Sequence, residues 1–194
     1  MDVNPGKVSR CRYQNQRIRV AGPPAGPAHL PEVAVTAPTV VDQAVAFRAT
    51  MSHLPSGVSV ITTRTGDTPV GMTASSVTAL SLDPLQLLVC VGNQLFTRKA
   101  IAGHGLFGVN ILGEGSQDLA RQFASKGDRF AGVDYVEEHG VPMLRAAIAT
   151  VVCEVATELP GGDHTIFVGT ARRFEHNSAG RPLVHFRGEF GRIV

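Results

Sequence analysis

The chain has 194 residues, of which 43% are hydrophobic, and carries a formal net charge of +2 at pH 7. This length suits one domain with a sizeable apolar core, and the small charge argues against nucleic-acid binding. Its apolar runs are far shorter than the roughly 20 residues of a membrane span, and no apolar signal core follows the N-terminus. We therefore expect a cytoplasmic protein that binds neither membranes nor nucleic acid.

Residues 1–40 contain half of the 12 prolines and most of the basic excess. Proline removes a backbone donor and cannot continue a helix, so this segment is expected to be an extended or disordered arm. Two roles stay open for it: a leader without function, or an arm that lies on a partner subunit. The folded domain is placed at residues 41–194.

Residues 42–54 are expected to form the first helix of this domain. Phe47, Met51 and Leu54 recur at steps of four and three residues, which places them on one helix face, and Asp42 suits the N-cap. The elements that follow, in chain order, are a strand at 58–63, a turn at 64–69, a bent strand or strand pair at 70–82, a strand at 85–91, a helix at 96–105, a strand at 106–112, a helix at 116–124 capped by Ser116, and strands at 147–159, 164–176 and 182–188.

The sequence thus predicts about seven strands and three short helices. Three helices are too few for a doubly wound sheet, in which a helix follows most strands. No GxGxxG sequence follows a strand, so a Rossmann dinucleotide site is not indicated. We expect a mainly β protein, a small Greek-key-like barrel of mostly antiparallel strands with a few short helices packed around it.

The polar residues form no recognisable metal site and no recognisable hydrolase motif. The seven histidines show no HExxH or HxxxH spacing, so no metal site is expected, and Cys90 and Cys153 lie in apolar runs that are typical of buried thiols. Ser75 and Ser76 lie in no GxSxG sequence, which leaves a serine hydrolase as a weakly supported alternative. Few titratable groups at strand ends favour an enzyme whose cofactor supplies the reactivity.

The stretch "GMTASSVTALS" at residues 71–81 is small and hydroxylated, without acid, base or thiol. Such a surface allows a flat ring to approach closely, and its hydroxyl and backbone groups suit the polar edge of an isoalloxazine. A tightly packed barrel wall explains the same residues equally well. The stretch alone does not separate these two interpretations.

Seven blocks occur in an order that resembles the flavin reductase family, the reductase components of two-component flavin monooxygenases. They are "FRATMSHLPSGVSVITT", "GMTASSVTALSLDP", "LLVCVGN", "FGVNIL", "LARQFASKGDRFAGV", "GDHTIFVG" and "PLVHFRGEF". The resemblance covers nearly everything from Phe47 to Phe190. It implies an FMN-binding split barrel, a homodimer, and a flavin groove at the subunit interface.

The resemblance also implies the site residues. For flavin it implies Thr73, Ala74, Ser75, Ser76, Cys90, Val91, Asn93, Thr97, Asn110, Phe123, Ala124, Lys126 and Arg129, with a structural ion pair to Asp128 or Glu137 as the alternative for Arg129. His164 matches a position near the nicotinamide, and a strand histidine in the barrel wall is its alternative. His185 and Phe190 stand where the family often has tyrosine, Leu95 where it often has serine, and Leu85 where it often has a second proline; His185 is a candidate substitute contact.

These features predict an NAD(P)H-dependent flavin reductase that uses NADH or NADPH and reduces FMN or FAD. The expected reaction passes a hydride from the nicotinamide to flavin N5, and the reduced flavin then serves a partner monooxygenase. The alternative is a non-catalytic flavin- or haem-binding split-barrel module that acts as a sensor, store or electron-transfer partner. Oxidation of NAD(P)H with added flavin separates the two.

Overall fold

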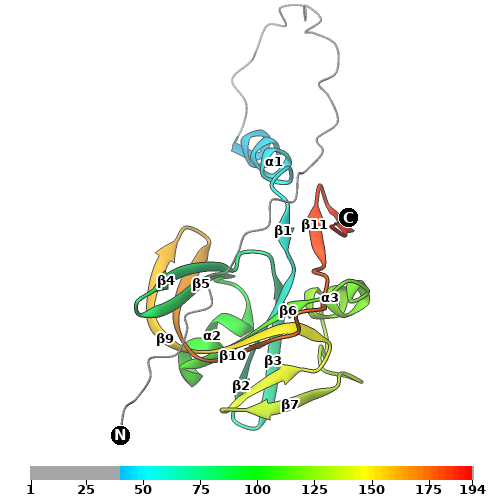
Figure 1. Ribbon diagram of the computed structural model, residues 1–194. Helices are drawn as coiled ribbons and strands as arrows, with labels where there is room; N and C mark the ends of the chain where they lie inside the picture. The colour runs from blue at the N-terminus through cyan, green and yellow to red at the C-terminus, as the bar shows by residue number, and fades with distance from the viewer. Residues whose placement is uncertain (1–39, 194) are drawn as a thin grey trace, which may run out of the picture. The chain divides into compact units, whose positions relative to one another are not determined.

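The computed structural model describes residues 40–193 (Figure 1). The arm expected at residues 1–40 therefore lies outside the described residues except for Val40, which begins α1 (Val40–Met51). This helix matches the one expected at 42–54, but its apolar face is not covered by any part of the chain that the structure describes. Phe47 is 68% exposed and Leu54, just beyond the helix, is 64% exposed.

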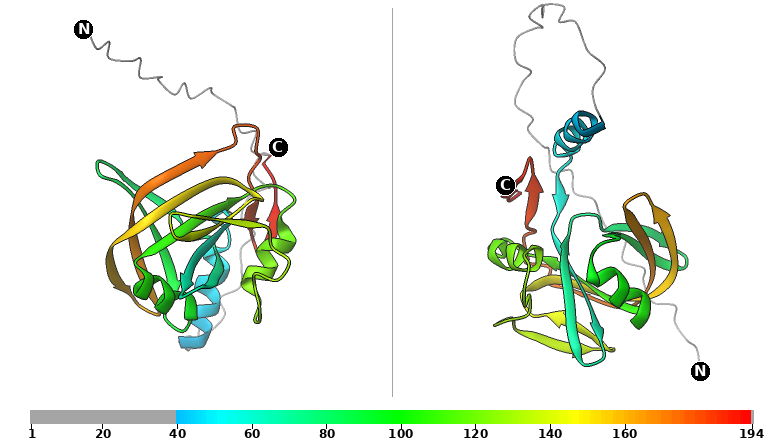
Figure 2. Two further views of the ribbon diagram at one scale, coloured as in Figure 1. Left: turned by 90° about the horizontal axis from the view of Figure 1, so that it is seen from below. Right: turned by 180° about the vertical axis from the view of Figure 1, so that it is seen from behind.

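The main sheet contains seven antiparallel strands in the order β3-β2-β6-β9-β10-β5-β4. Their bounds are β2 Ser59–Thr65, β3 Thr68–Ala74, β4 Thr78–Leu82, β5 Leu85–Gly92, β6 Leu106–Leu112, β9 Ala147–Gly161 and β10 His164–His176. The long strands β9 and β10 curve across the domain in the left view of Figure 2. The mainly β fold expected from the sequence is thus confirmed.

Ser76 closes this sheet into a barrel. It follows β3, which lies at one edge, and its hydroxyl donates to Cys90 O of β5 near the other edge at 3.0 Å and accepts from Cys90 N at 3.2 Å. A side chain thereby replaces the backbone ladder where the polypeptide bends between β3 and β4. The bend expected within residues 70–82 has this physical role.

The shorter elements lie around the barrel. They are α2 Phe96–His104, α3 Gln117–Ala124, the hairpin of β7 Tyr135–Glu138 with β8 Val141–Leu144, and a small sheet of β1 Ser56–Gly57, β11 Val184–Phe186 and β12 Glu189–Gly191. Gly105 ends α2 in the left-handed conformation with φ 76°, where the sequence left Gly103 and Gly105 as the two candidates. Ser116 precedes α3, but its side chain makes no capping hydrogen bond. No helix within residues 40–193 is long and apolar enough to cross a membrane.

The hairpin β7–β8 was not expected from the sequence. Its strands are only four residues each, and Pro142 lies inside the second, which disfavours a strand prediction. His139 and Gly140 form its turn with φ of 49° and 84°, the left-handed values that a tight hairpin turn requires. The hairpin then covers β6 and β2 with the buried side chains of Val141 and Met143.

Three apolar clusters form the core, the smallest of which is Val141, Met143 and Val152 under the β7–β8 hairpin. The barrel interior holds the largest one, which includes Ile61, Val89, Val91, Phe107 and Phe167. The second lies between the barrel and α3 and includes Leu112, Ala120, Phe123, Leu144 and Leu183. Each of these two larger clusters joins strands that are distant in the sequence, so the barrel and its helical cover are packed as one unit.

Gly169 of β10 is required by packing, and its replacement by Ala is expected to destabilise the protein. A Cβ atom there would lie 2.5 Å from Phe107 Cζ and 2.8 Å from Cys153 Cβ. Overpacking of this kind costs about 1–3 kcal/mol, which corresponds to a melting temperature roughly 2–12 °C lower for a chain of this size. Thermal unfolding followed by circular dichroism measures the change.

The matched control is Gly103→Ala on α2, where an added Cβ would meet no heavy atom within 4 Å. Alanine has the better helix propensity, so this variant is expected to be unchanged or up to about 1 kcal/mol more stable. If both variants melted at the wild-type temperature, the packing around Gly169 would be looser than the structure indicates.

Candidate functional site

The small, hydroxylated stretch of residues 71–81 runs from the end of β3 into β4 and contains both packing residues and exposed residues. Thr73 Oγ1 donates a 2.6 Å hydrogen bond to Ala120 O of α3, and Ala74 is buried. A Cβ at Gly71 would lie 2.7 Å from Phe123 Cε1, so its small size serves the core. Ser75 is exposed. The barrel-wall interpretation therefore explains residues 71–74, and Ser75 is the first exposed residue after them.

A small-residue face, formed by Cys90 and Gly92, lies on β5 next to β10, and the Ser76 hydroxyl bonds to Cys90 at this face. Cys90 pairs with Ile166 and Gly92 pairs with His164 across these strands. These four residues are half-buried or exposed, because the alternation of β5 directs the intervening side chains into the barrel core. A Cβ at Gly92 would lie 3.6 Å from the Leu95 side chain and 3.9 Å from His164 Nε2. The Leu95 and His164 side chains therefore lie close to Gly92, which keeps the strand itself free of a side chain at this point.

His164 is oriented by its neighbour Asp163. The two side chains are joined by a 2.7 Å hydrogen bond between His164 Nδ1 and Asp163 Oδ1, and this bond and the charge of His164 lower the pKa of the Asp163 carboxyl. An ionised carboxylate can only accept a hydrogen bond. Nδ1 therefore carries the proton of this bond, and Nε2 is the ring nitrogen on the side of Gly92.

A cavity of about 480 Å³ adjoins His164. A chain of hydrogen bonds forms its wall: Asn93 Nδ2 donates to Gly162 O at 3.2 Å, Thr165 Oγ1 donates to Asn93 Oδ1 at 2.8 Å, and Arg98 Nε donates to Thr165 Oγ1 at 3.2 Å. This chain connects the end of β5, the start of β10 and helix α2. The expected residue Asn93 is therefore next to His164, held by contacts that leave the cavity open.

A second cavity, of about 460 Å³, lies between β3, the N-terminus of α2 and the loop after α3. Thr97 and Arg129 line it. Arg129 donates from Nε to Ser125 O and from Nη1 to Gly71 O, both at 2.7 Å, and forms no ion pair with Asp128 or Glu137 within the described residues. The structural ion pair weighed for Arg129 is thus replaced by bonds to main-chain carbonyls. Lys126 is exposed on the same loop.

The chain matches a known protein family. The model of the flavin reductase like domain family matches residues 51–193, most of the chain. The chain belongs to this family. The small-residue face and the two cavities are therefore features of a flavin reductase-like domain.

Characterised relatives and solved structures agree with this assignment. The reductase component of a 4-nitrophenol 4-monooxygenase/4-nitrocatechol 2-monooxygenase from Rhodococcus opacus is 40% identical over 150 residues, which cover 76% of this chain and 80% of that protein. An NADH-dependent FAD reductase from Streptomyces globisporus is 38% identical over 157 residues, covering 77% and 86%. A structure of the NADH:FAD oxidoreductase from Streptomyces globisporus with NAD and FAD fragments is 33% identical, with a TM-score of 0.75 over 78% of this chain and 93% of that one.

Several residues that the resemblance implied lie away from the exposed face of the flavin reductase-like domain. Asn110 is fully buried; its Nδ2 donates to Val60 O and Thr62 Oγ1, both at 3.0 Å, and its Oδ1 accepts from Leu144 N at 2.7 Å. These three bonds engage the whole side-chain amide of Asn110 in holding the core together. Val91 and Phe123 are fully buried in the two larger core clusters. Within this chain, none of these three side chains is open to a ligand.

His185 and Ala124 complete the expected set. His185 lies on β11, opposite Ser56 of β1, with its ring 5.8 Å from that of Phe190. It is thus in the small sheet and does not line the cavity next to His164. Ala124 is the last residue of α3 and is exposed at the start of the loop that holds Lys126.

Arg98 and Glu158 are site residues that the sequence did not indicate. Both line the cavity next to His164, and Arg98 Nη2 lies 3.4 Å from Glu158 Oε2. They are 60 residues apart in the chain, and each resembles an ordinary surface charge in its own segment. The only local signal was the position of Arg98 directly after Thr97.

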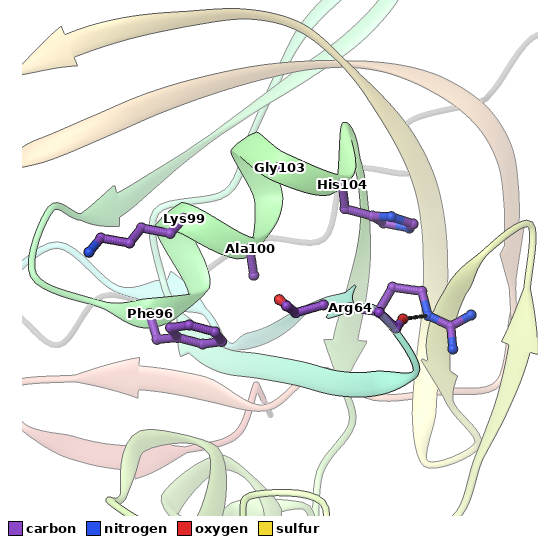
Figure 3. A pocket seen from close by; sticks show the side chains of 8 residues that line it. Arg64, Phe96, Lys99, Ala100, Gly103 and His104 are labelled. Carbon is purple, nitrogen blue, oxygen red and sulfur yellow. Dashed lines mark hydrogen bonds between the residues drawn. The ribbon is translucent and has the colours of Figure 1, made fainter.

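A third cavity, of about 270 Å³, lies beneath α2 and contains none of the expected site residues (Figure 3). Phe96 and Lys99 extend from one end of the helix and His104 from the other. Arg64 of β2 lies across from them, and its Nε donates to Gly66 O at 2.9 Å. Phe96 also lines the second cavity, so the two cavities share one wall.

Proposed function

We propose that this protein is an NADH-dependent flavin reductase that supplies reduced FMN or FAD to a partner monooxygenase. The observation that carries the proposal is the pairing of the small-residue face of Cys90 and Gly92 with the β10 strand that starts at His164, in a chain that belongs to the flavin reductase like domain family. Relatives are named as NADH-dependent reductases of FAD and FMN and as the reductase component of a monooxygenase. A non-catalytic module has no such support.

The residues present fit a flavin. The small-residue face suits the planar isoalloxazine ring, because small side chains let the ring approach β5. The cavity at Arg129, with Lys126 exposed on the same loop, suits the anionic tail, since positive charge and a helix N-terminus both favour phosphate; Arg129 Nε and Nη1 already bond to main-chain carbonyls, and Nη2 makes no hydrogen bond within residues 40–193. Bound flavin supplies the hydride acceptor for the reduced nicotinamide.

The protein has no proton to move in this hydride transfer, so its contribution is positioning. The small-residue face stacks the two rings, and His164 Nε2 accepts a hydrogen bond from the nicotinamide amide. Holding both rings in contact and excluding water between them lowers the entropic part of the barrier. His164 is therefore a binding residue for the nicotinamide.

Replacing His164 with Ala is expected to raise the KM for NADH while leaving flavin affinity nearly intact. Loss of one neutral hydrogen bond costs about 0.5–1.5 kcal/mol, a rise of roughly 2- to 13-fold. Initial-rate kinetics over a range of NADH concentrations and flavin fluorescence titration measure the two quantities. A weaker affinity for flavin with unchanged NADH kinetics would mean that His164 contacts the flavin and not the nicotinamide.

We also propose that the protein works as a homodimer whose second subunit completes the flavin groove. Phe47, Met51 and Leu54 present an apolar face on and after α1 that the described part of the chain leaves exposed. An obligate interface buries about 2,000 Å² or more. Light scattering that gave a fully active monomer at micromolar concentration would contradict the dimer.

A steady-state matrix of NADH and NADPH against riboflavin, FMN and FAD tests the function. We expect NADH oxidation that depends on added flavin, with NADH preferred to NADPH. A protein that bound flavin but oxidised neither nicotinamide would be the non-catalytic module instead. Adding a two-component monooxygenase that lacks its reductase, together with its substrate, then tests delivery of the reduced flavin.

A further inference from the structure

Arg98 is held in an orientation that leaves part of its guanidinium open. Its side chain is 36% exposed on α2. Nε donates to Thr165 Oγ1 at 3.2 Å and Nη2 lies 3.4 Å from Glu158 Oε2, whereas Nη1 has no hydrogen bond within residues 40–193. The bond to Thr165 fixes the plane of the fork, and the longer contact to Glu158 is easily exchanged because both groups meet solvent.

The cavity next to His164 holds one permanently charged group of each sign. Arg98 is the one permanent cation among its lining residues, and Glu158 is its one carboxylate. A dinucleotide brings a diphosphate with two negative charges, for which an arginine fork is the best side-chain partner. Because the cavity also holds His164, a ligand whose nicotinamide meets His164 extends toward Arg98.

We propose that Arg98 binds the diphosphate of NADH and that Glu158 limits the strength of this contact by competing for the same guanidinium. The inference rests on the proposed function, which places the nicotinamide at His164. It adds a binding residue on α2 and a carboxylate on β9 that weakens NADH binding, which favours release of NAD⁺ after each turnover. Thr165 is the positioning residue, since its hydroxyl holds Arg98 Nε.

Four variants test the pair. In Arg98→Gln the KM for NADH is expected to rise roughly tenfold, and in Arg98→Lys less, because lysine keeps the charge but loses the fork. In Glu158→Gln the KM for NADH is expected to fall about two- to fivefold. The matched control is Glu154→Gln, also on β9, whose partner Arg172 lies outside the cavity; its KM should not change.

Reduced nicotinamide riboside, which carries no phosphate, separates diphosphate binding from structural damage. Arg98→Gln is expected to leave kcat/KM for this substrate, kcat at saturating NADH, and the Kd for FMN within about twofold of wild type. An equal loss with NADH and with the riboside would make Arg98 a structural clamp and overturn the proposal, as would an unchanged KM for NADH. Failure of the wild-type protein to oxidise NADH with FMN would instead refute the proposed function.

Discussion

Replacing Ser75 with Leu is expected to lower the affinity for FMN and FAD at least roughly tenfold while the fold survives. Ser75 is exposed between β3 and β4, next to the Ser76 hydroxyl that bonds to Cys90. A leucine side chain there projects over the small-residue face and occupies the space of the isoalloxazine ring. A tenfold loss of affinity corresponds to about 1.4 kcal/mol of binding free energy. Flavin fluorescence titration measures the affinity.

The fold survives this change because no side-chain hydrogen bond of Ser75 within the described residues is lost. Ser178→Leu, in the exposed turn after β10, is the matched control and should bind flavin as the wild type does. A well-folded Ser75→Leu variant with wild-type flavin affinity would place the ring elsewhere. Reduced affinity in both variants would point to a general effect of an exposed leucine.

Replacing Asn110 with Ala is expected to lower the free energy of unfolding by about 2–5 kcal/mol, with little effect on the flavin affinity of the folded protein. The substitution removes three hydrogen bonds and leaves Val60 O and Leu144 N without this partner in the core. Each buried group left unpaired costs about 1–3 kcal/mol. Chemical denaturation followed by intrinsic fluorescence or circular dichroism measures the loss.

Asn177→Ala is the control for this experiment. Asn177 is exposed, and its Oδ1 accepts from Ala179 N at 3.0 Å in a surface turn, so its loss should cost under about 1 kcal/mol. If Asn110→Ala kept its stability and lost flavin affinity, Asn110 would be a ligand contact as the family resemblance implies. The buried geometry favours the structural role.

Residue patterns within the sequence were sufficient to predict most elements. The alternation at residues 164–176 predicted β10, and the apolar run at 106–112 predicted β6, because strand faces repeat every second residue whatever the rest of the chain does. A glycine was expected to end α2, either Gly103 or Gly105, since the left-handed conformation is a local preference of glycine; the structure selects Gly105. The family resemblance, carried by seven ordered blocks, likewise needed no coordinates.

Only the tertiary structure separated packing residues from surface residues in the small stretch of residues 71–81. Gly71 is small because Phe123 packs against it, and Ser76 is a serine because Cys90 of β5 needs a partner for both of its backbone groups. Ser75, which lies between Gly71 and Ser76 in the sequence, is the exposed residue of the three. Sequence alone treated all three alike, because the atoms that distinguish them belong to other elements.

The same reason explains the site residues that the sequence did not indicate. Arg98 and Thr165 are 67 residues apart, and their hydrogen bond exists only because β10 pairs with β5, whose end leads into α2. Asn110 looked like a strand residue near the flavin until its three bonds placed it in the core. Local periodicity determines which segments are strands and helices, whereas the closure of the barrel determines which of their side chains meet one another and which meet a ligand.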